Sequence, residues 1–344
     1  MDQGFGATSS MNATVNALLT EMDGLRHAEN NIVVLAATNV SESMLDSALL
    51  RPGRFDRKIY VTLPNLKERK ELFKFYLSKV NVDPSVNPDI LAQKTVWFSP
   101  SQIDSMVREA GIFALREKRE IITFKDLSNA YDRIAYGDKS NVIMPEKEKN
   151  WVAYHEAGHA IIGYILHPTD DVIKATIIPR KGSLGMVSSR PSEEQHLSYK
   201  ETLLADIKIS IAAYVAERLK FGYTSSGVGG GATSDFQHAM SVASHMVTSL
   251  GMGKSGLVGD FLSMRDYHGN FNISEKTKQM LDDDVQDILQ SCIKDVEGIL
   301  MKHKDLFEYF AQELLRKEEL EYDEIVAIFD KFAIKPASRS DKKA

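Results

Sequence analysis

The HExxH segment at residues 155–159 constrains this chain more than any other stretch. The flanking residues carry Trp, Val and Ile at helical spacing, so we predict a partly buried helix from about residue 150 to residue 166. Residues four apart on a helix lie on one face, so His155 and His159 can direct imidazole nitrogens at one ion. Burial of such polar groups requires a partner that offsets their desolvation, and a zinc ion would supply it.

Glu156 is the further functional group of this segment. Its helical position is rotated about a quarter turn from that of His155, so its carboxylate can reach a zinc-bound water without binding the metal. Zinc lowers the pKa of such a water, a carboxylate takes its proton, and the hydroxide attacks a polarised peptide carbonyl. The spacing therefore predicts a zincin-type site with Glu156 as its base.

Two histidines leave a third protein ligand to be found. The metzincin form is excluded because Ile162 and Ile165 stand where it requires glycine and histidine. The candidates are Glu217, which follows an apolar helical run, and Asp235, which follows a glycine-rich stretch at a predicted helix start. His238, one turn after Asp235, is a weaker third candidate and more typical of a packing residue. Spacing alone does not decide between the two carboxylates.

Composition sets the broad class of the protein. A chain of 344 residues is long enough for two domains or more, and 43% hydrophobic with 26% charged residues is a globular balance. The net charge of −6 argues against nucleic-acid binding, and a single cysteine excludes an internal disulfide. No apolar run reaches the roughly 18 residues of a membrane helix, and no secretory signal begins the chain. We therefore expect a soluble protein of a reducing compartment.

The first part of the chain has an α/β pattern. Residues 1–13 are predicted to form a loop and residues 15–22 a helix. Residues 32–37 form a short apolar run rich in β-branched side chains, which is typical of a strand buried on both faces in a parallel sheet. Residues 58–63 are predicted to form another strand. The fold class expected here is α/β, followed by mostly α structure.

Helical patterns dominate from residue 66 onward. Asn65 and Glu68 form a predicted capping box, followed by helices that include residues 102–119 and 124–136. Further helices are expected over 150–166, 198–221, 235–250 and from 274, with strands near 172–178 and 185–189. The predicted organisation is a partial α/β unit (1–65), a helical lid (66–138), a linker (139–149), a mainly helical metal-binding domain (150–334) and a disordered tail (335–344).

A second functional cluster follows the predicted sheet strand. Arg51 and Arg54 flank a rigid Pro-Gly turn, with a third arginine at residue 57. Guanidinium groups held on such a turn could reach a phosphate group, including one across a subunit interface.

Taken together, these motifs resemble FtsH-type proteins, the membrane-anchored ATP-dependent zinc metalloproteases of the AAA+ class and of peptidase family M41. The resemblance runs nearly end to end, in family order. It implies the C-terminal part of an AAA+ ATPase module with a helical lid, followed by a zincin-type metalloprotease domain. The matching segments are residues 18–24, 36–39, 49–57, 154–160, 176–180 and 234–235.

The resemblance also implies roles for particular residues. His155 and His159 match the family's zinc ligands, and Glu156 matches its catalytic base. Asp235 matches the third zinc ligand, and Glu217 matches a carboxylate that supports the zinc site from outside the ligand set. The strand near residues 184–187 matches an edge that binds substrate peptide by strand addition. In the nucleotide-binding part, Asn39 matches the sensor asparagine, and Arg51 and Arg54 match the arginine fingers that act on the ATP of the next subunit.

The family's GxxxxGK[ST] motif is missing from this chain, as are its acidic Mg²⁺ site, its aromatic pore loop and its membrane spans. All of them would precede Met1. We therefore expect Zn²⁺ as the cofactor of this chain, with ATP and Mg²⁺ bound only through a complete ring or a full-length partner. No nucleic-acid partner is expected.

The leading hypothesis is a zinc endopeptidase that hydrolyses unfolded or membrane proteins within an ATP-driven homo- or hetero-hexamer. Its location would be membrane-associated, at a bacterial or organelle inner membrane, through an anchor outside this chain or through partners. One alternative is a non-catalytic subunit that donates Arg51 and Arg54 to full-length partners. Another is an ATP-independent peptidase that acts on chains already unfolded.

Overall fold

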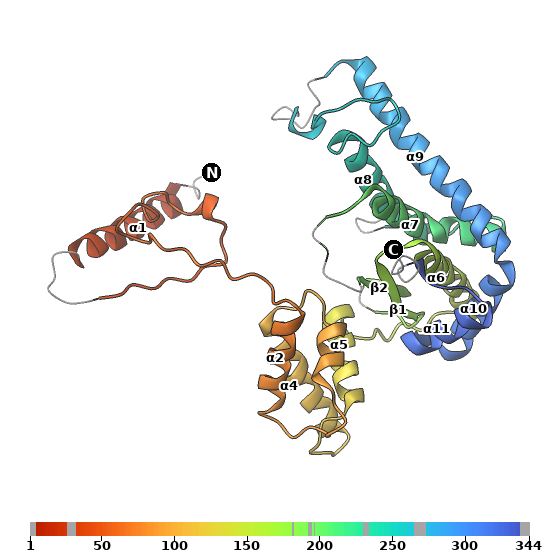
Figure 1. Cartoon of the computed structure of the whole chain (residues 1–344), viewed down its shortest axis with the longest axis horizontal. Coiled ribbons are helices and arrows are strands. Elements are labelled where there is room, and N and C mark those ends of the chain that lie inside the picture. Colours follow the sequence, from red (N-terminus) through yellow and green to blue (C-terminus); the bar gives the residue numbers. More distant parts are fainter. Residues whose placement is uncertain are drawn as a thin grey trace, which may run out of the picture. The chain divides into compact units, whose positions relative to one another are not determined.

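The computed structural model describes residues 5–25, 32–180, 182–191, 195, 197–229, 234–264 and 273–337. It divides into two compact units, Met1–Thr62 and Leu63–Ala344 (Figure 1). Parts of the predicted glycine-rich stretch and of the predicted tail lie outside the described residues.

The first unit corrects two sequence-based expectations. Its helix α1 spans Phe5–Leu25, so the predicted loop over residues 1–13 is wrong from Phe5 onward. The prediction of a loop relied on the Gly, Ser and Thr content of these residues. The first proline of the chain is Pro52, so no proline interrupts a helix over residues 5–25. A short 3₁₀ turn at Glu42–Met44 follows.

The two predicted strands of this unit are extended but unpaired. Val33 is 81% exposed and Leu35 is 90% exposed, where a strand buried on both faces was expected, and Val61 in the second predicted strand is also 90% exposed. The described residues of this unit form no sheet with one another. The sheet that the structure contains is built from strands later in the chain. An apolar strand is buried only when neighbouring strands and helices cover it, so the pattern alone did not determine this outcome.

The second unit begins with a bundle of short helices. The capping box at Asn65 is confirmed: its side chain accepts from the Glu68 amide, and its own amide donates to the Glu68 carboxylate. Phe73, Ile103 and Leu127 lie in the core of this bundle, which we call the lid core. The helices are α2 (Leu66–Leu77), α3 (Pro88–Lys94), α4 (Pro100–Arg116) and α5 (Phe124–Tyr136).

The described residues of the rest of this unit form six further helices and a small antiparallel sheet, which packs against α6, α10 and α11. The helices are α6 (Glu146–Leu166), α7 (Lys200–Phe221), α8 (Asp235–Thr248), α9 (Glu275–Lys302), α10 (Lys304–Lys317) and α11 (Tyr322–Lys331). The strands are β1 (Asp170–Thr176), β2 (Met186–Pro191) and β3 (Glu319–Glu321), in the order β2-β1-β3. Helix α6 starts four residues before the predicted position, and β3 was not predicted because three residues carry too little pattern.

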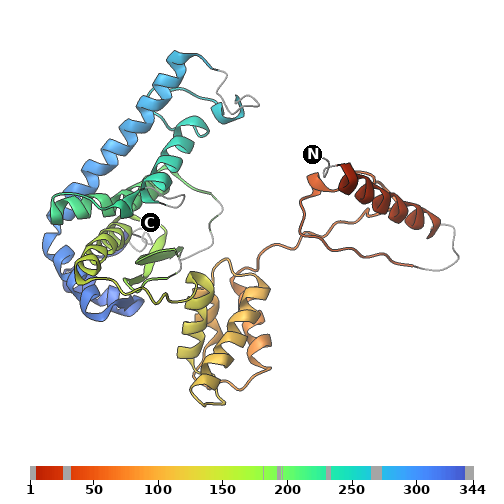
Figure 2. The same ribbon diagram turned by 180° about the vertical axis from the view of Figure 1, so that it is seen from behind.

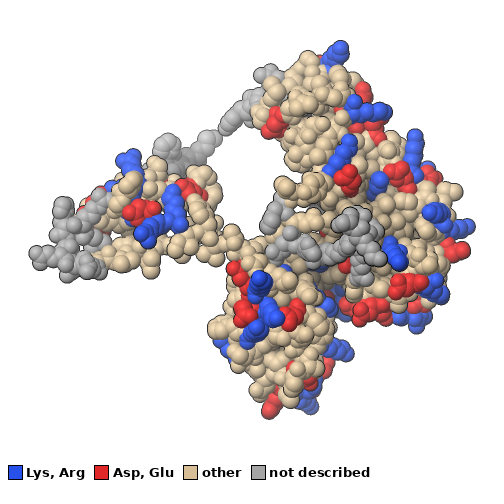
Figure 3. Space-filling model, in the orientation of Figure 1, with Lys and Arg blue, Asp and Glu red and all other residues tan. Residues whose placement is uncertain are grey.

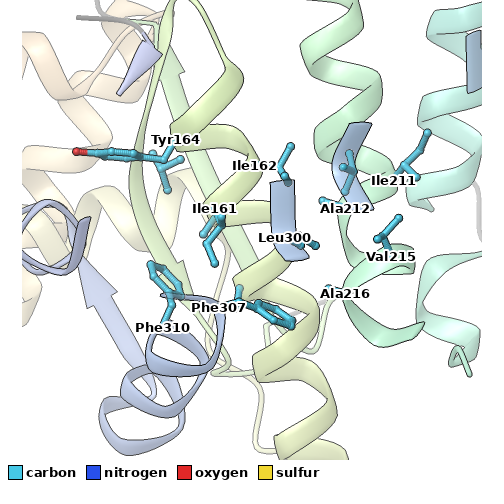
Figure 4. Packing of buried hydrophobic residues seen from close by; sticks show 14 of the residues in the cluster. Ile161, Ile162, Tyr164, Ile211, Ala212, Val215, Ala216, Leu300, Phe307 and Phe310 are labelled. Atoms are coloured by element: carbon cyan, nitrogen blue, oxygen red, sulfur yellow. The ribbon is translucent and has the colours of Figure 1, made fainter. Parts of the chain in front are cut away.

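Helix α6 lies at the centre of a second core, distinct from the lid core. Its residues from Ala153 to Tyr164 are nearly all buried, as expected of a helix that is apolar on most sides. It packs against α7 and against β1, and these elements lie side by side in both views (Figure 2). Figure 4 shows Ile161 of α6, Phe307 of α10, and Ala212 and Ala216 of α7, which all belong to this core.

Helix hydropathy and surface charge bear on whether the chain could cross a membrane or present a strongly charged face. Among the described ranges, no helix combines the length and the apolarity that crossing a bilayer requires. Lysines and arginines lie interspersed with aspartates and glutamates on the face drawn in Figure 3.

The contact between α6 and α7 depends on Gly158. A Cβ at this position would lie 2.8 Å from the Ala216 Cβ and 2.9 Å from the Ala212 carbonyl oxygen. We therefore expect Gly158→Ala to lower the free energy of unfolding by about 1–3 kcal/mol, because the two helices must separate.

The matched control is Gly298→Ala in α9, where an added Cβ would have no neighbour within 4 Å. This change should stabilise the protein by about 0.5–1 kcal/mol through helix propensity. Differential scanning calorimetry at one fixed zinc concentration measures both effects. Equal shifts in the two variants would contradict the close approach of α6 and α7.

Candidate metal centre

Three potential metal-binding atoms converge at one point between α6 and α8. The Nε2 atoms of His155 and His159 lie 3.3 Å apart. The Oδ2 atom of Asp235 lies 3.3 Å from the first and 3.4 Å from the second. Helix α6 presents the two histidines one turn apart, and Asp235 is the first residue of α8. The structure therefore brings together His155, His159 and Asp235, the three residues predicted as zinc ligands.

The hydrogen bonds behind the two imidazoles determine which nitrogen faces the site. His159 Nδ1 lies 2.7 Å from the Ile209 carbonyl oxygen, which can only accept, so this nitrogen carries a proton. His155 Nδ1 lies 2.8 Å from Glu217 Oε1 and donates in the same way. Both Nε2 atoms therefore present lone pairs to the centre, as metal-binding histidines do.

The arrangement fits a zinc ion. Asp235 Oδ2 is buried and has no hydrogen-bond partner, although two imidazole lone pairs face it. Three electron-pair donors that converge without a hydrogen between them require a cation. Ligands about 2.0–2.2 Å from a tetrahedral zinc lie about 3.3–3.6 Å from one another, which agrees with the donor separations here.

The electrostatics of the group also favour positive charge at its centre. Burial by itself would lower the pKa of His155, but the neighbouring carboxylates of Asp235 and Glu217 outweigh burial and raise that pKa to about 10. Burial would raise the pKa of Asp235, yet the two imidazoles hold it well below its usual range. A cation that binds here therefore meets a carboxylate that is already ionised.

The structure distinguishes the three candidates for the third donor. Glu217 is fully buried but turned away from the centre: it accepts from His155 Nδ1 and from the Ser225 amide and hydroxyl. Burial opposes ionisation of Glu217, but these hydrogen bonds prevail and lower its pKa. His238 Nδ1 bonds to the Ser210 hydroxyl instead, 2.9 Å away. Asp235 is thus the candidate that reaches both Nε2 atoms.

Glu156 lines a cleft of about 1260 Å³ together with His155, His159 and Asp235. Its side chain is almost completely buried, and burial raises its pKa, with the facing imidazoles opposing that shift. A carboxylate with a raised pKa holds a proton more readily, which is what a general base needs.

Gly185 lies in the segment 184–187 that was predicted to bind substrate peptide, but sequence reasoning did not predict its contact with Glu156. A Cβ there would lie 2.6 Å from Glu156 Oε1 and 2.7 Å from Val152 Cγ1. The glycine therefore lets the chain just before β2 pass directly over the carboxylate. Nothing in the local pattern signals this, because the contact joins segments that are distant in sequence.

The nucleotide-related candidates lie in the first unit. Asn39 and Arg51 are exposed. The Arg54 guanidinium donates to both carboxylate oxygens of Asp23, at 3.0 and 2.5 Å, and to the Ala48 carbonyl oxygen. Their roles toward a nucleotide remain a prediction.

Comparison with known families matches three segments of the chain. The model described as peptidase family M41 matches residues 142–328, which include all the donors above and Glu156. The model of the ATPase family associated with various cellular activities (AAA) matches residues 2–63, and that of the AAA+ lid domain matches residues 85–129. The predicted resemblance and fold class are confirmed.

Curated relatives agree with these matches. The ATP-dependent zinc metalloprotease FtsH of Borreliella burgdorferi is 36% identical over 330 residues, 93% of this chain and 50% of the relative. FtsH of aster yellows witches'-broom phytoplasma is 39% identical over 94% of this chain and 47% of its own length. Human ATP-dependent zinc metalloprotease YME1L1 is 36% identical over 92% of this chain and 40% of its own length. The chain spans about half the length of the relatives it matches. It belongs to peptidase family M41.

Proposed function

We propose that this chain hydrolyses peptide bonds as a zinc endopeptidase. The observation that carries the proposal is the convergence of His155, His159 and Asp235 on one point beside the buried Glu156. These three residues would hold the zinc ion, with Glu217 and the Ile209 carbonyl fixing the two imidazoles. A bound zinc ion supplies a Lewis acid that polarises the scissile carbonyl and acidifies water.

Glu156 is the group that moves the proton. Its carboxylate takes a proton from the attacking water and can pass it to the leaving amide nitrogen. Burial raises the pKa of the Glu156 carboxyl, so the carboxylate can take the proton from water and hold it until the amide nitrogen leaves.

Strand β2 is the element that would receive the substrate. It pairs with β1 on one side only, and Met186, Val187 and Ser189 line the cleft. An extended peptide could add to the other edge, with main-chain hydrogen bonds giving affinity and side-chain pockets giving selectivity.

We further propose that the chain acts on unfolded or membrane proteins within an ATP-driven hexameric ring at a membrane. The AAA and lid matches and the ATP-dependent names of the relatives support this. ATP and Mg²⁺ would act through a complete ring or a full-length partner, with Asn39, Arg51 and Arg54 at the nucleotide.

Glu156→Gln should reduce cleavage of unfolded casein by about 10²–10⁴-fold, because the amide cannot accept the proton. Zinc content, measured by mass spectrometry, should stay at the wild-type level. The control is Glu148→Gln, an exposed carboxylate of α6 that also lines the cleft. If Glu156→Gln keeps most of the activity, the assignment of the base is wrong.

Zinc affinity discriminates among the three candidate donors. Asp235→Asn removes a ligand charge and should weaken zinc binding by more than about 100-fold, whereas Glu217→Gln should weaken it by about 10–100-fold. His238→Ala is the control and should bind zinc as the wild type does. Competition with a chromogenic chelator measures all three. A larger loss in Glu217→Gln than in Asp235→Asn would reverse the assignment.

Gly185→Ala should lower kcat by about 100-fold, because the new methyl group displaces the Glu156 carboxylate. Zinc binding should not change, since the three atoms nearest to the new methyl group belong to Glu156 and Val152, neither of which is a proposed zinc ligand. Parallel measurement of casein cleavage and zinc content tests this. A variant with normal kcat would show that the contact between Gly185 and Glu156 is not needed for the reaction.

A further inference from the structure

We propose that Tyr136, the last residue of lid helix α5, is a positioning residue that holds the cleft strand β2 in place for peptide binding. The inference rests on the proposed function, since it concerns the cleft of that peptidase. Four observations support it: the two faces of β2, its contacts with α5, the anchoring of Tyr136, and the exposed edge of the sheet.

The two faces of β2 have different neighbours. Successive residues of a strand point to opposite faces. Met186, Val187 and Ser189 line the cleft, so the separation into two faces holds from Val187 onward. Ser188 and Arg190 alternate with them and contact the lid instead.

Helix α5 makes three contacts with this face of the sheet, two with β2 and one with β1. The Tyr136 hydroxyl donates to Ser188 Oγ over 2.9 Å. Arg190 Nε donates to the Tyr131 hydroxyl over 3.2 Å. Lys174, the partner of Ser188 across the β1–β2 ladder, donates to the carboxylate of Asp132. One helix of the lid therefore holds both strands on the side opposite the cleft.

Tyr136 is itself fixed by the lid core. Its ring packs edge-on against Tyr131, with centroids 5.7 Å apart, and Tyr131 stacks on Phe98 at 5.5 Å. Burial raises the pKa of Tyr136 above its usual range, so its hydroxyl keeps the proton that it donates. The position of Ser188 is thus tied to packed aromatic residues.

Strand β2 needs this restraint because it lies at the edge of the sheet. It has one neighbouring strand, and the β1–β2 register is interrupted between Val172 and Lys174. A loose edge strand must become ordered when a peptide pairs with it, and that ordering reduces affinity. The metal donors and Glu156 lie on α6 and α8, so loosening β2 should raise KM and leave kcat within about twofold.

The first test measures the strand without any need for activity. Hydrogen–deuterium exchange of the β2 amides is compared in the zinc-loaded wild type, Tyr136→Phe and Ser188→Ala. Loss of one hydrogen bond should speed exchange by about 3–10-fold. The control is Tyr309→Phe, which removes the hydroxyl of a partly buried tyrosine in α10, outside the cleft lining. It should leave β2 unchanged.

The second test measures peptide binding. A fluorescein-labelled, unstructured peptide is titrated by anisotropy on the Glu156→Gln background, and KM and kcat are measured with the same sequence on the active background. Tyr136→Phe and Ser188→Ala should each raise Kd and KM by about 3–10-fold, and the double variant should add nothing beyond either single change.

The possible outcomes separate the two proposals. Unchanged exchange and Kd in both variants, strictly additive effects, or a fall in kcat at constant KM would overturn the role of Tyr136. Absence of turnover in the wild type would count against the proposed function, while exchange and Kd would still decide the role of Tyr136. If Tyr136→Phe does not fold, Ser188→Ala tests the proposal by itself. Faster β2 exchange and a higher Kd support the role of Tyr136, and unchanged values overturn it.

Discussion

The burial of three polar side chains within helix α6 is the constraint on which the rest of the structure depends. His155, Glu156 and His159 lie on a helix surrounded by apolar residues, so each must recover the interactions that it loses on leaving water. Helix α7 provides two of the compensating groups, the Glu217 carboxylate and the Ile209 carbonyl. These groups come close enough because α6 has a glycine where the two helices cross. Helix packing and site chemistry therefore depend on one contact.

The cleft joins elements that differ in how firmly they are held. The α6 and α7 side belongs to a continuous apolar core, where displacement would cost packing and buried area. The β2 side is an edge strand with one neighbouring strand and polar contacts behind it. A rigid catalytic side and a more adjustable binding side suit an enzyme that must align one reacting bond in chains of varied sequence.

Local patterns predicted the features that depend on near neighbours in sequence. The histidine pair one turn apart and the capping box at Asn65 follow from helical geometry, and both are present. The pattern could not choose between Glu217 and Asp235, because that choice depends on where α8, which packs against α7 and α9, places its first residue. The Gly185 contact with Glu156 escaped notice for the same reason. The apolar run at residues 32–37 was predicted to be buried, yet burial requires covering elements that the pattern does not supply.

The two apolar cores of the second unit share no residue among those described. The contacts that link the lid to the sheet are hydrogen bonds and ion pairs, such as Tyr136 with Ser188 and Lys174 with Asp132. Polar groups can exchange such partners for water at small net cost, whereas separated apolar surfaces cannot. The joint can therefore open while both cores stay folded. Its ion pair joins Lys174 and Asp132, whose side chains are only 3% and 14% exposed, so dissolved salt screens that pair little while the joint is closed. Water must enter the joint before ionic strength can act on it.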